Sequence, residues 1–162
     1  QTLMKDHAEE INRLTAGVPR ADWAELSAES KKARVAEGEK IEATVCDHDA
    51  SDRATLRAGG IFTVAAEKDV KTGIEAVQAR LKKQPDGRPR LFYFNNCLVE
   101  ADQVLIDQGL PFSTVQEYDS YIWQKAPDGK AAKEEPTKLN DHGLDCTRYA
   151  TKYGDKKRFN YG

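Results

Sequence analysis

The chain has 162 residues, of which 39% are hydrophobic and 32% are charged, and its formal net charge is −2. This length fits one domain with a sizeable core, and the charge excludes a protein whose overall positive field attracts nucleic acid. No apolar run reaches the roughly 20 residues that span a bilayer, and no signal-peptide core is present, so no membrane partner is expected. The three cysteines (Cys46, Cys97 and Cys146) lack a disulfide-like spacing, which favours a reducing compartment.

Hydrophobic spacing and chain-breaking residues predict helices that alternate with short strands. The expected helices cover residues 3–15, 22–38, 50–57, 73–83, 98–106, 115–121 and 140–153. The expected strands cover residues 41–46, 61–65, 91–94 and 121–123, and a polar loop is expected at 126–137. This alternation is typical of βαβ units, so the predicted fold class is α/β, with a mixed, mostly parallel sheet flanked by helices. One domain is expected over residues 1–153, followed by a frayed basic C-terminal tail at 154–162.

Residues 138–149, KLNDHGLDCTRY, contain the densest group of candidate site residues. Asn140 is expected to cap a helix whose first turn holds Asp141, where the helix dipole favours a negative charge. Asp145 lies one turn further along the same face, and His142 reaches it at the i, i+3 spacing. Two carboxylates and an imidazole on one face predict a metal corner. The alternative is a solvated acidic turn with a structural histidine.

A second acidic stretch follows the strand expected at 41–46. Sites in open α/β sheets form beyond the carboxyl ends of the strands, and Asp47 directly follows this strand. The alternative is turn chemistry, since Asp49 can cap the next helix. If Asp47 approaches Asp141 and Asp145, the carboxylates can hold Mg²⁺ or Mn²⁺, which prefer oxygen ligands. Two such ions can activate a water and stabilise the leaving oxygen of a phosphodiester.

A zinc site is a second possibility, with the softer ligands Cys46, His48, His142 and Cys146. It has less support, because the chain has no CxxC pair and Cys46 points the same way as His48 only if the strand continues. The chain also lacks GxGxxG and Walker-type glycine loops, so neither dinucleotide binding nor P-loop chemistry is expected.

Four pieces of the sequence form a series: VCDHDASDRATLRAGGI at 45–61, RPRLFYF at 88–94, the set Glu117, Tyr121 and Trp123, and KLNDHGLDCTRYA at 138–150. Taken together, they resemble the nuclease domain of the large terminase subunit of tailed bacteriophages. The last piece, with the pattern K.NDH..D..RY, is the most specific, and together they cover roughly residues 1–152. The resemblance implies a ribonuclease-H-like fold and a metal-dependent endonuclease that cuts concatemeric double-stranded DNA during genome packaging.

The same resemblance implies roles for individual residues. Asp47 matches the strand-end metal ligand, and Asp145 matches the aspartate of the C-terminal helix. His142 matches a catalytic residue near the metals, Asp141 a further ligand, and Lys138 a phosphate contact. The implied cofactor is a pair of Mg²⁺ or Mn²⁺ ions. The implied partners are double-stranded DNA, an upstream ATPase domain, the small terminase subunit and the portal protein, in the host bacterial cytoplasm. Structural roles are expected for Glu117, Tyr121, Trp123, Arg148 and Tyr149.

The chain departs from the family in one respect, because family members also use an aspartate on the first strand of the sheet. Before Ile41 the only aspartates are Asp6 and Asp22, both in helix-like surroundings. The chain is therefore expected to begin after the first strands, with an incomplete fold, weak metal affinity and low activity. Two other functions stay open: a non-catalytic docking domain, and another ribonuclease-H-like nuclease such as a junction resolvase.

Overall fold

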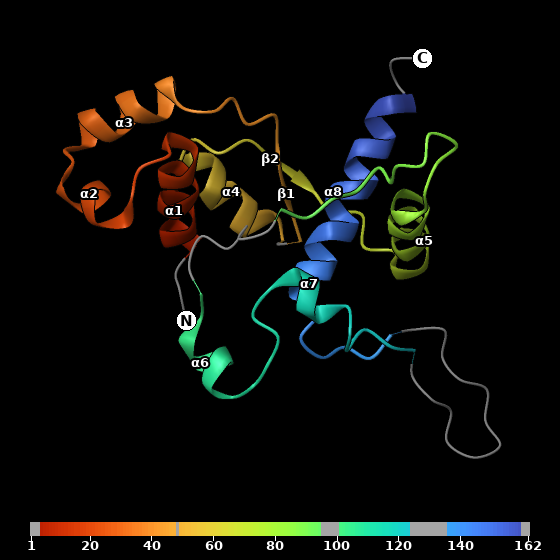
Figure 1. The fold of residues 1–162 in the computed structure, drawn as a ribbon. Helices are drawn as coiled ribbons and strands as arrows, with labels where there is room; N and C mark the ends of the chain where they lie inside the picture. The colour runs from red at the N-terminus through yellow and green to blue at the C-terminus, as the bar shows by residue number, and fades with distance from the viewer. Residues whose placement is uncertain (1–3, 48, 95–100, 124–135, 160–162) are drawn as a thin grey trace. The chain divides into compact units, whose positions relative to one another are not determined.

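The computed structural model describes residues 4–47, 49–94, 101–123 and 136–159, with side chains up to residue 156 (Figure 1). The sequence predicted one domain over 1–153, whereas the chain forms two compact units, residues 1–66 and 67–162. Each unit is described by itself. In the described ranges the protein is mixed α/β, and none of the helices found there is long and apolar enough to cross a membrane.

The first unit begins with helices and ends in a βαβ motif. Its elements are α1 (Met4–Ala16), α2 (Arg20–Glu25), α3 (Ala28–Glu37), β1 (Thr44–Cys46), α4 (Ala50–Ala58) and β2 (Thr63–Ala65). The single helix predicted at 22–38 is wrong, because the chain breaks at Leu26, whose backbone is extended. Ser27 then caps α3, since its side-chain oxygen accepts the Ser30 N–H (3.2 Å).

The β1–α4–β2 motif confirms the predicted strand–helix–strand pattern at 41–65. The two strands are parallel, with Thr44 opposite Thr63 and Cys46 opposite Ala65. Asp49 caps α4, because its Oδ1 accepts the Asp52 N–H (2.9 Å). The core of this unit is small and apolar, and consists of Ala8, Cys46, Leu56 and Ile61 with Met4 and Ile11 packed against them.

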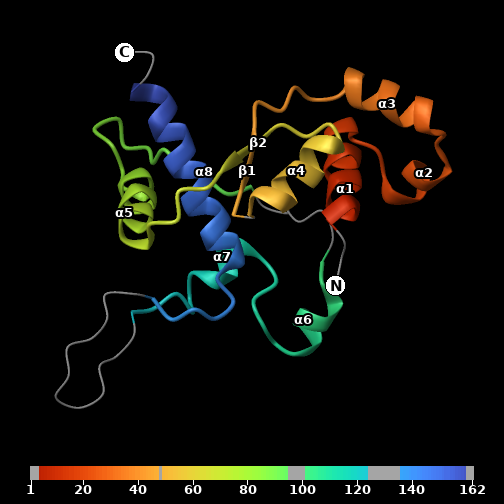
Figure 2. The ribbon, with the colours of Figure 1, turned by 180° about the vertical axis from the view of Figure 1, so that it is seen from behind.

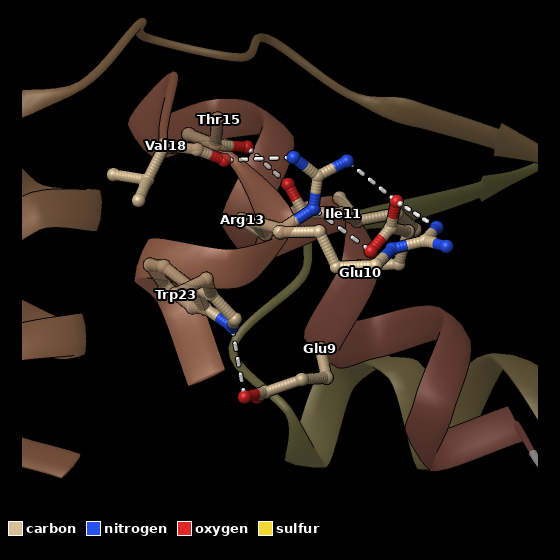
Figure 3. Close-up of polar contacts among 8 residues, drawn as sticks. Glu9, Glu10, Ile11, Arg13, Thr15, Val18 and Trp23 are labelled. Carbon is tan, nitrogen blue, oxygen red and sulfur yellow. Dashed lines mark hydrogen bonds and ion pairs between the residues drawn. The ribbon is translucent and has the colours of Figure 1, made fainter. Parts of the chain in front are cut away.

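A polar cluster connects α1 to the chain that follows it (Figure 3). Arg13 is only 6% exposed, and its guanidinium donates to both carboxylate oxygens of Glu10 (2.6 and 2.9 Å) and to the Val18 carbonyl (2.7 Å). The Trp23 indole N–H donates to Glu9 (2.9 Å), which also pairs with Lys31 (2.7 Å). A buried arginine needs such partners, because an unpaired buried charge is costly. The cluster therefore fixes how α2 and α3 pack beside α1.

The second unit is centred on a long C-terminal helix. Its elements are α5 (Val70–Leu81), α6 (Gln103–Asp107), α7 (Thr114–Glu117) and α8 (His142–Phe159). Helices α5 and α8 lie side by side in both views (Figures 1 and 2), and Arg80 pairs with Asp155 near their C-terminal ends. The Lys152 ammonium donates to the Thr72 hydroxyl (3.3 Å), so the two helices run parallel. Helix α7 packs on the start of α8.

Several predictions for the second unit differ from the structure. The strand predicted at 91–94 is wrong, because this segment has no strand partner among the described residues. Residues 121–123 form only an isolated bridge, between Trp123 and Pro136. Helix α8 continues to Phe159, so the tail expected to fray from residue 154 is largely helical. Residues 98–100 of a predicted helix and 126–135 of the predicted loop lie outside the described residues. The mostly parallel sheet is reduced, in the described chain, to the pair β1–β2.

We expect the Glu10–Arg13 pair to make stability depend on pH. The Arg13 hydrogen bond lowers the pKa of Glu10 from 4.5 to about 2. The stabilisation is therefore complete above about pH 5 and is lost as the pH falls from about 4.5 to about 2. Because the Glu10 side chain is 35% exposed, solvent screening reduces the effect to about 1 kcal/mol. Chemical unfolding of the wild type and Glu10→Gln between pH 7 and pH 2 measures it.

The control for this experiment is Glu37→Gln, which changes an exposed glutamate on α3. The difference in unfolding free energy between wild type and Glu10→Gln should shrink in the acidic range, and that for Glu37→Gln should stay flat. A Glu10→Gln difference that is independent of pH would contradict the assignment.

Candidate functional site

The start of α8 carries most of the predicted site residues, and its backbone differs from the prediction. Asn140 has a positive φ of 51°, so the expected helix cap at this position is wrong. Asparagine is among the residues that adopt this left-handed conformation most readily. Helix α8 begins at His142, and the Asp145 N–H donates to the Asp141 carbonyl (2.8 Å). Asp141 therefore occupies the position that flanks the helix.

A carboxylate from α7 anchors this helix start. Glu117 is buried, with 9% of its surface exposed, and accepts the N–H of Gly143 (3.1 Å) and the N–H of Leu144 (2.8 Å). These N–H groups have no partner within the helix, and the helix dipole favours a negative charge at this end. A Cβ at position 143 would collide with the Thr114 side chain and approach Glu117, so glycine permits the contact. The sequence predicted a structural Glu117 but not this capping role.

Asp145, the residue matched to the helix-borne metal ligand, is paired with Arg148. The Arg148 Nη2 group donates to Asp145 Oδ1, and Arg148 is only 4% exposed. Burial lowers the pKa of Arg148, but the hydrogen bond and charge of Asp145 outweigh burial, and the pKa is raised. The Asp145 side chain remains 26% exposed. His142 is exposed, and its predicted contact with Asp145 is not found within the described part of the chain.

The Tyr121 hydroxyl lies near the same charges. Burial raises its pKa, the charge of Arg148 opposes this, and the charges of Asp145 and Asp141 raise it further. Both carboxylates therefore lie in the surroundings of one phenol. The Tyr121 hydroxyl and the Arg148 Nε and Nη1 groups are buried and lack hydrogen-bond partners among the residues described. The second unit thus gathers two carboxylates, one guanidinium and one phenol at the start of α8.

The segment 91–94 contacts α8 through a side chain rather than as a strand. The Tyr93 hydroxyl shares hydrogen bonds with the hydroxyls of Tyr118 (2.9 Å) and Thr147 (3.1 Å). Burial raises the pKa of Tyr118, and the bond to Tyr93 adds to the shift. Phe92 and Phe94 remain 66% and 84% exposed. Tyr93 therefore attaches this segment to the second turn of α8.

The remaining predicted site residues belong to different units of the chain. Asp47 is exposed and follows β1 directly, at the carboxyl end of the parallel pair, as the sequence predicted. It belongs to the first unit, whereas Asp141, His142 and Asp145 belong to the second. Lys138 is exposed and precedes α8 in the second unit. Asp141 and Asp145 therefore lie near each other in the second unit, whereas Asp47 belongs to the first.

Carboxylate oxygens are gathered at the start of α8. Asp141 and Asp145 offer carboxylate oxygens of the kind that Mg²⁺ and Mn²⁺ prefer. In the described ranges, however, no group of three or more His, Cys, Asp or Glu side chains could hold a metal ion. Burial raises the pKa of Cys46, although the charge of Arg53 opposes it, and this disfavours the thiolate that zinc needs. Of the other expected zinc ligands, His48 lies outside the described residues.

We expect Glu117→Ala to loosen the start of α8. Two N–H groups lose their acceptor, one of them buried, and the expected loss of unfolding free energy is about 2 kcal/mol. Amide hydrogen exchange should become faster at Gly143 and Leu144 in particular. Asp119→Ala, which removes an exposed carboxylate two residues further on, is the matched control and should leave both amides protected. Unchanged protection in Glu117→Ala would show that another group caps the helix.

Comparisons with protein-family models, with curated proteins and with solved structures give no match. The function is therefore argued from the chemistry of this chain's own residues.

Proposed function

We propose that this chain is the nuclease part of a terminase large subunit. In this proposal it is a metal-dependent endonuclease that cuts concatemeric double-stranded phage DNA. The observation that carries the proposal is the K.NDH..D..RY segment, which spans the start of α8. Within it, Asp145 presents a partly exposed carboxylate from a helix start that Glu117 anchors. The proposed fold is ribonuclease-H-like, and the β1–α4–β2 motif is compatible with it. The proposed partners are the ATPase domain, small subunit and portal protein of a packaging assembly in the host cytoplasm.

In this proposal each residue has a defined task. Asp145 uses Oδ1 to pair with Arg148, so its second oxygen is the one offered to a metal ion. Asp141, beside the helix start of the same unit, supplies a further oxygen ligand. Lys138 contacts phosphate, and the exposed imidazole of His142 moves a proton. Bound Mg²⁺ or Mn²⁺ ions would polarise the phosphodiester and lower the pKa of the attacking water.

A non-catalytic docking domain is the second candidate, and a specific contact favours it. The carboxylate of Asp145 is already neutralised by the buried cation of Arg148. A divalent ion has to share this carboxylate with the guanidinium, and the described residues supply no group of three donors to compensate. If the charge pair is purely structural, the chain binds a partner and not a metal. A junction resolvase, the remaining candidate, would prefer branched over linear DNA.

Manganese binding separates the nuclease from the docking domain. We expect Mn²⁺ at about ten times its Kd to add about 1.4 kcal/mol of stability, which raises Tm by about 3–6 °C. Asp145→Asn and Asp141→Asn should each abolish this rise, because each removes a ligand oxygen. The quantity compared is the Mn²⁺-dependent shift within each variant, since Asp145→Asn also destabilises the protein by leaving Arg148 unpaired.

Two exposed aspartates provide matched controls, Asp22→Asn for the first unit and Asp119→Asn for the second. Both should keep the full Mn²⁺ shift. Cleavage of linear duplex DNA in Mn²⁺, assayed with the same variants, should follow the same order. A wild type that shows neither a Tm rise nor cleavage would contradict the nuclease and favour the docking domain.

A further inference from the structure

A basic turn follows α5 in the second unit. We define it as residues 82–90, KKQPDGRPR, which contain four cations and a single acidic residue, Asp86. Arg90 pairs with Asp86 (2.8 Å). Lys82, Lys83 and Arg88 are exposed, and within the described chain no ion pair is found for them. Three positive charges therefore face solvent from one short turn of a protein whose net charge is −2.

The backbone of this turn is braced from both sides. The Gln84 N–H donates to the Arg88 carbonyl (3.0 Å), and the Gly87 N–H donates to the Gln84 carbonyl (2.8 Å). Gly87 has a φ of 77°, which glycine adopts without strain. Asp86 also accepts the Arg88 N–H (3.1 Å). Because the backbone is already ordered, a ligand that binds these cations causes little further loss of chain entropy.

Hydrogen bonds attach the turn to the helix pair α5–α8. The Arg90 N–H donates to the Arg80 carbonyl (2.7 Å), and Arg80 pairs with Asp155 of α8. At 1.5 Å per residue, Asp155 lies about 15 Å along the helix axis from Asp145. The turn is thus connected through α5 to the helix that carries Asp145.

We propose that the basic turn, in the same unit as Asp145, binds the phosphate backbone of double-stranded DNA. The inference rests on the proposed function for the identity of the polyanion. Ammonium and guanidinium groups bind phosphate through charge and carry no direct base readout, so the contact is independent of sequence. A local cationic surface is also what a protein of slightly negative net charge requires to hold DNA. The Arg90–Asp86 pair braces the turn and leaves Lys82, Lys83 and Arg88 for the phosphates.

The test measures the affinity of the full chain for a fluorescent 30-base-pair duplex in EDTA at several salt concentrations. We expect K82E/K83E/R88E to weaken binding at least tenfold. Because each lost phosphate contact lowers the steepness of the log Kd versus log salt line by about 0.9, the slope should fall by up to about 2.7. The neutral variant K82Q/K83Q/R88Q should lie between this variant and the wild type. All three positions are exposed, so circular dichroism should show native folding.

The matched control is K32E/R34E/K40E, which reverses the same number of exposed charges in the first unit. It changes the net charge equally, so any excess loss in the turn variant comes from the turn itself. Equal losses in the two variants, a turn variant that binds like the wild type, or a wild type that does not bind DNA would each overturn the inference.

The binding assay contains no divalent ion, so its result is independent of the nuclease proposal. Selective loss of binding in the turn variant, with a wild type that neither cleaves DNA nor responds to Mn²⁺, supports the DNA-binding surface and overturns the nuclease. Normal cleavage by the wild type, with no selective effect of the turn variant on binding, supports the nuclease and overturns the surface.

Discussion

The second unit depends on one carboxylate, that of Glu117, which accepts the N–H groups of Gly143 and Leu144 at the start of α8. A helix start has several N–H groups without partners in the helix, and a buried start without acceptors is unfavourable. Glu117 supplies both acceptors and a charge that the helix dipole stabilises. Glu117 therefore anchors the turns of α8 that carry Asp145 and Arg148.

The Asp145–Arg148 pair has two consequences that oppose each other. The guanidinium keeps the carboxylate ordered, which is favourable for a ligand that has to present an oxygen in a fixed direction. The same guanidinium neutralises the carboxylate, which weakens its attraction for a cation. The fixed orientation of the Asp145 carboxylate therefore strengthens metal binding, whereas its neutralisation by Arg148 weakens metal binding. Which of the two dominates decides between a nuclease and a docking domain.

The local parts of the fold were predictable from the sequence, and the parts that depend on distant partners were not. The β1–α4–β2 motif was predictable because its signals, such as the Asp49 cap and the Gly59-Gly60 stop, lie next to the elements they end. The strand predicted at 91–94 failed because a strand needs a neighbour, and Tyr93 instead bonds to Tyr118 and Thr147. Of the site, the position of Asp47 after β1 and the grouping of Asp141 with Asp145 were predictable. The Glu117 cap was not, because 26 residues separate it from Gly143.

The lack of a side chain at position 143 has a consequence for how this protein can vary. Any larger residue there would strike Thr114 and push against the Glu117 carboxylate, so positions 114, 117 and 143 are sterically interdependent. Chains that diverge from this one should keep the glycine and the acid as a set, or replace both in a single step. An alignment of such chains would therefore reveal the α7–α8 junction as covarying columns.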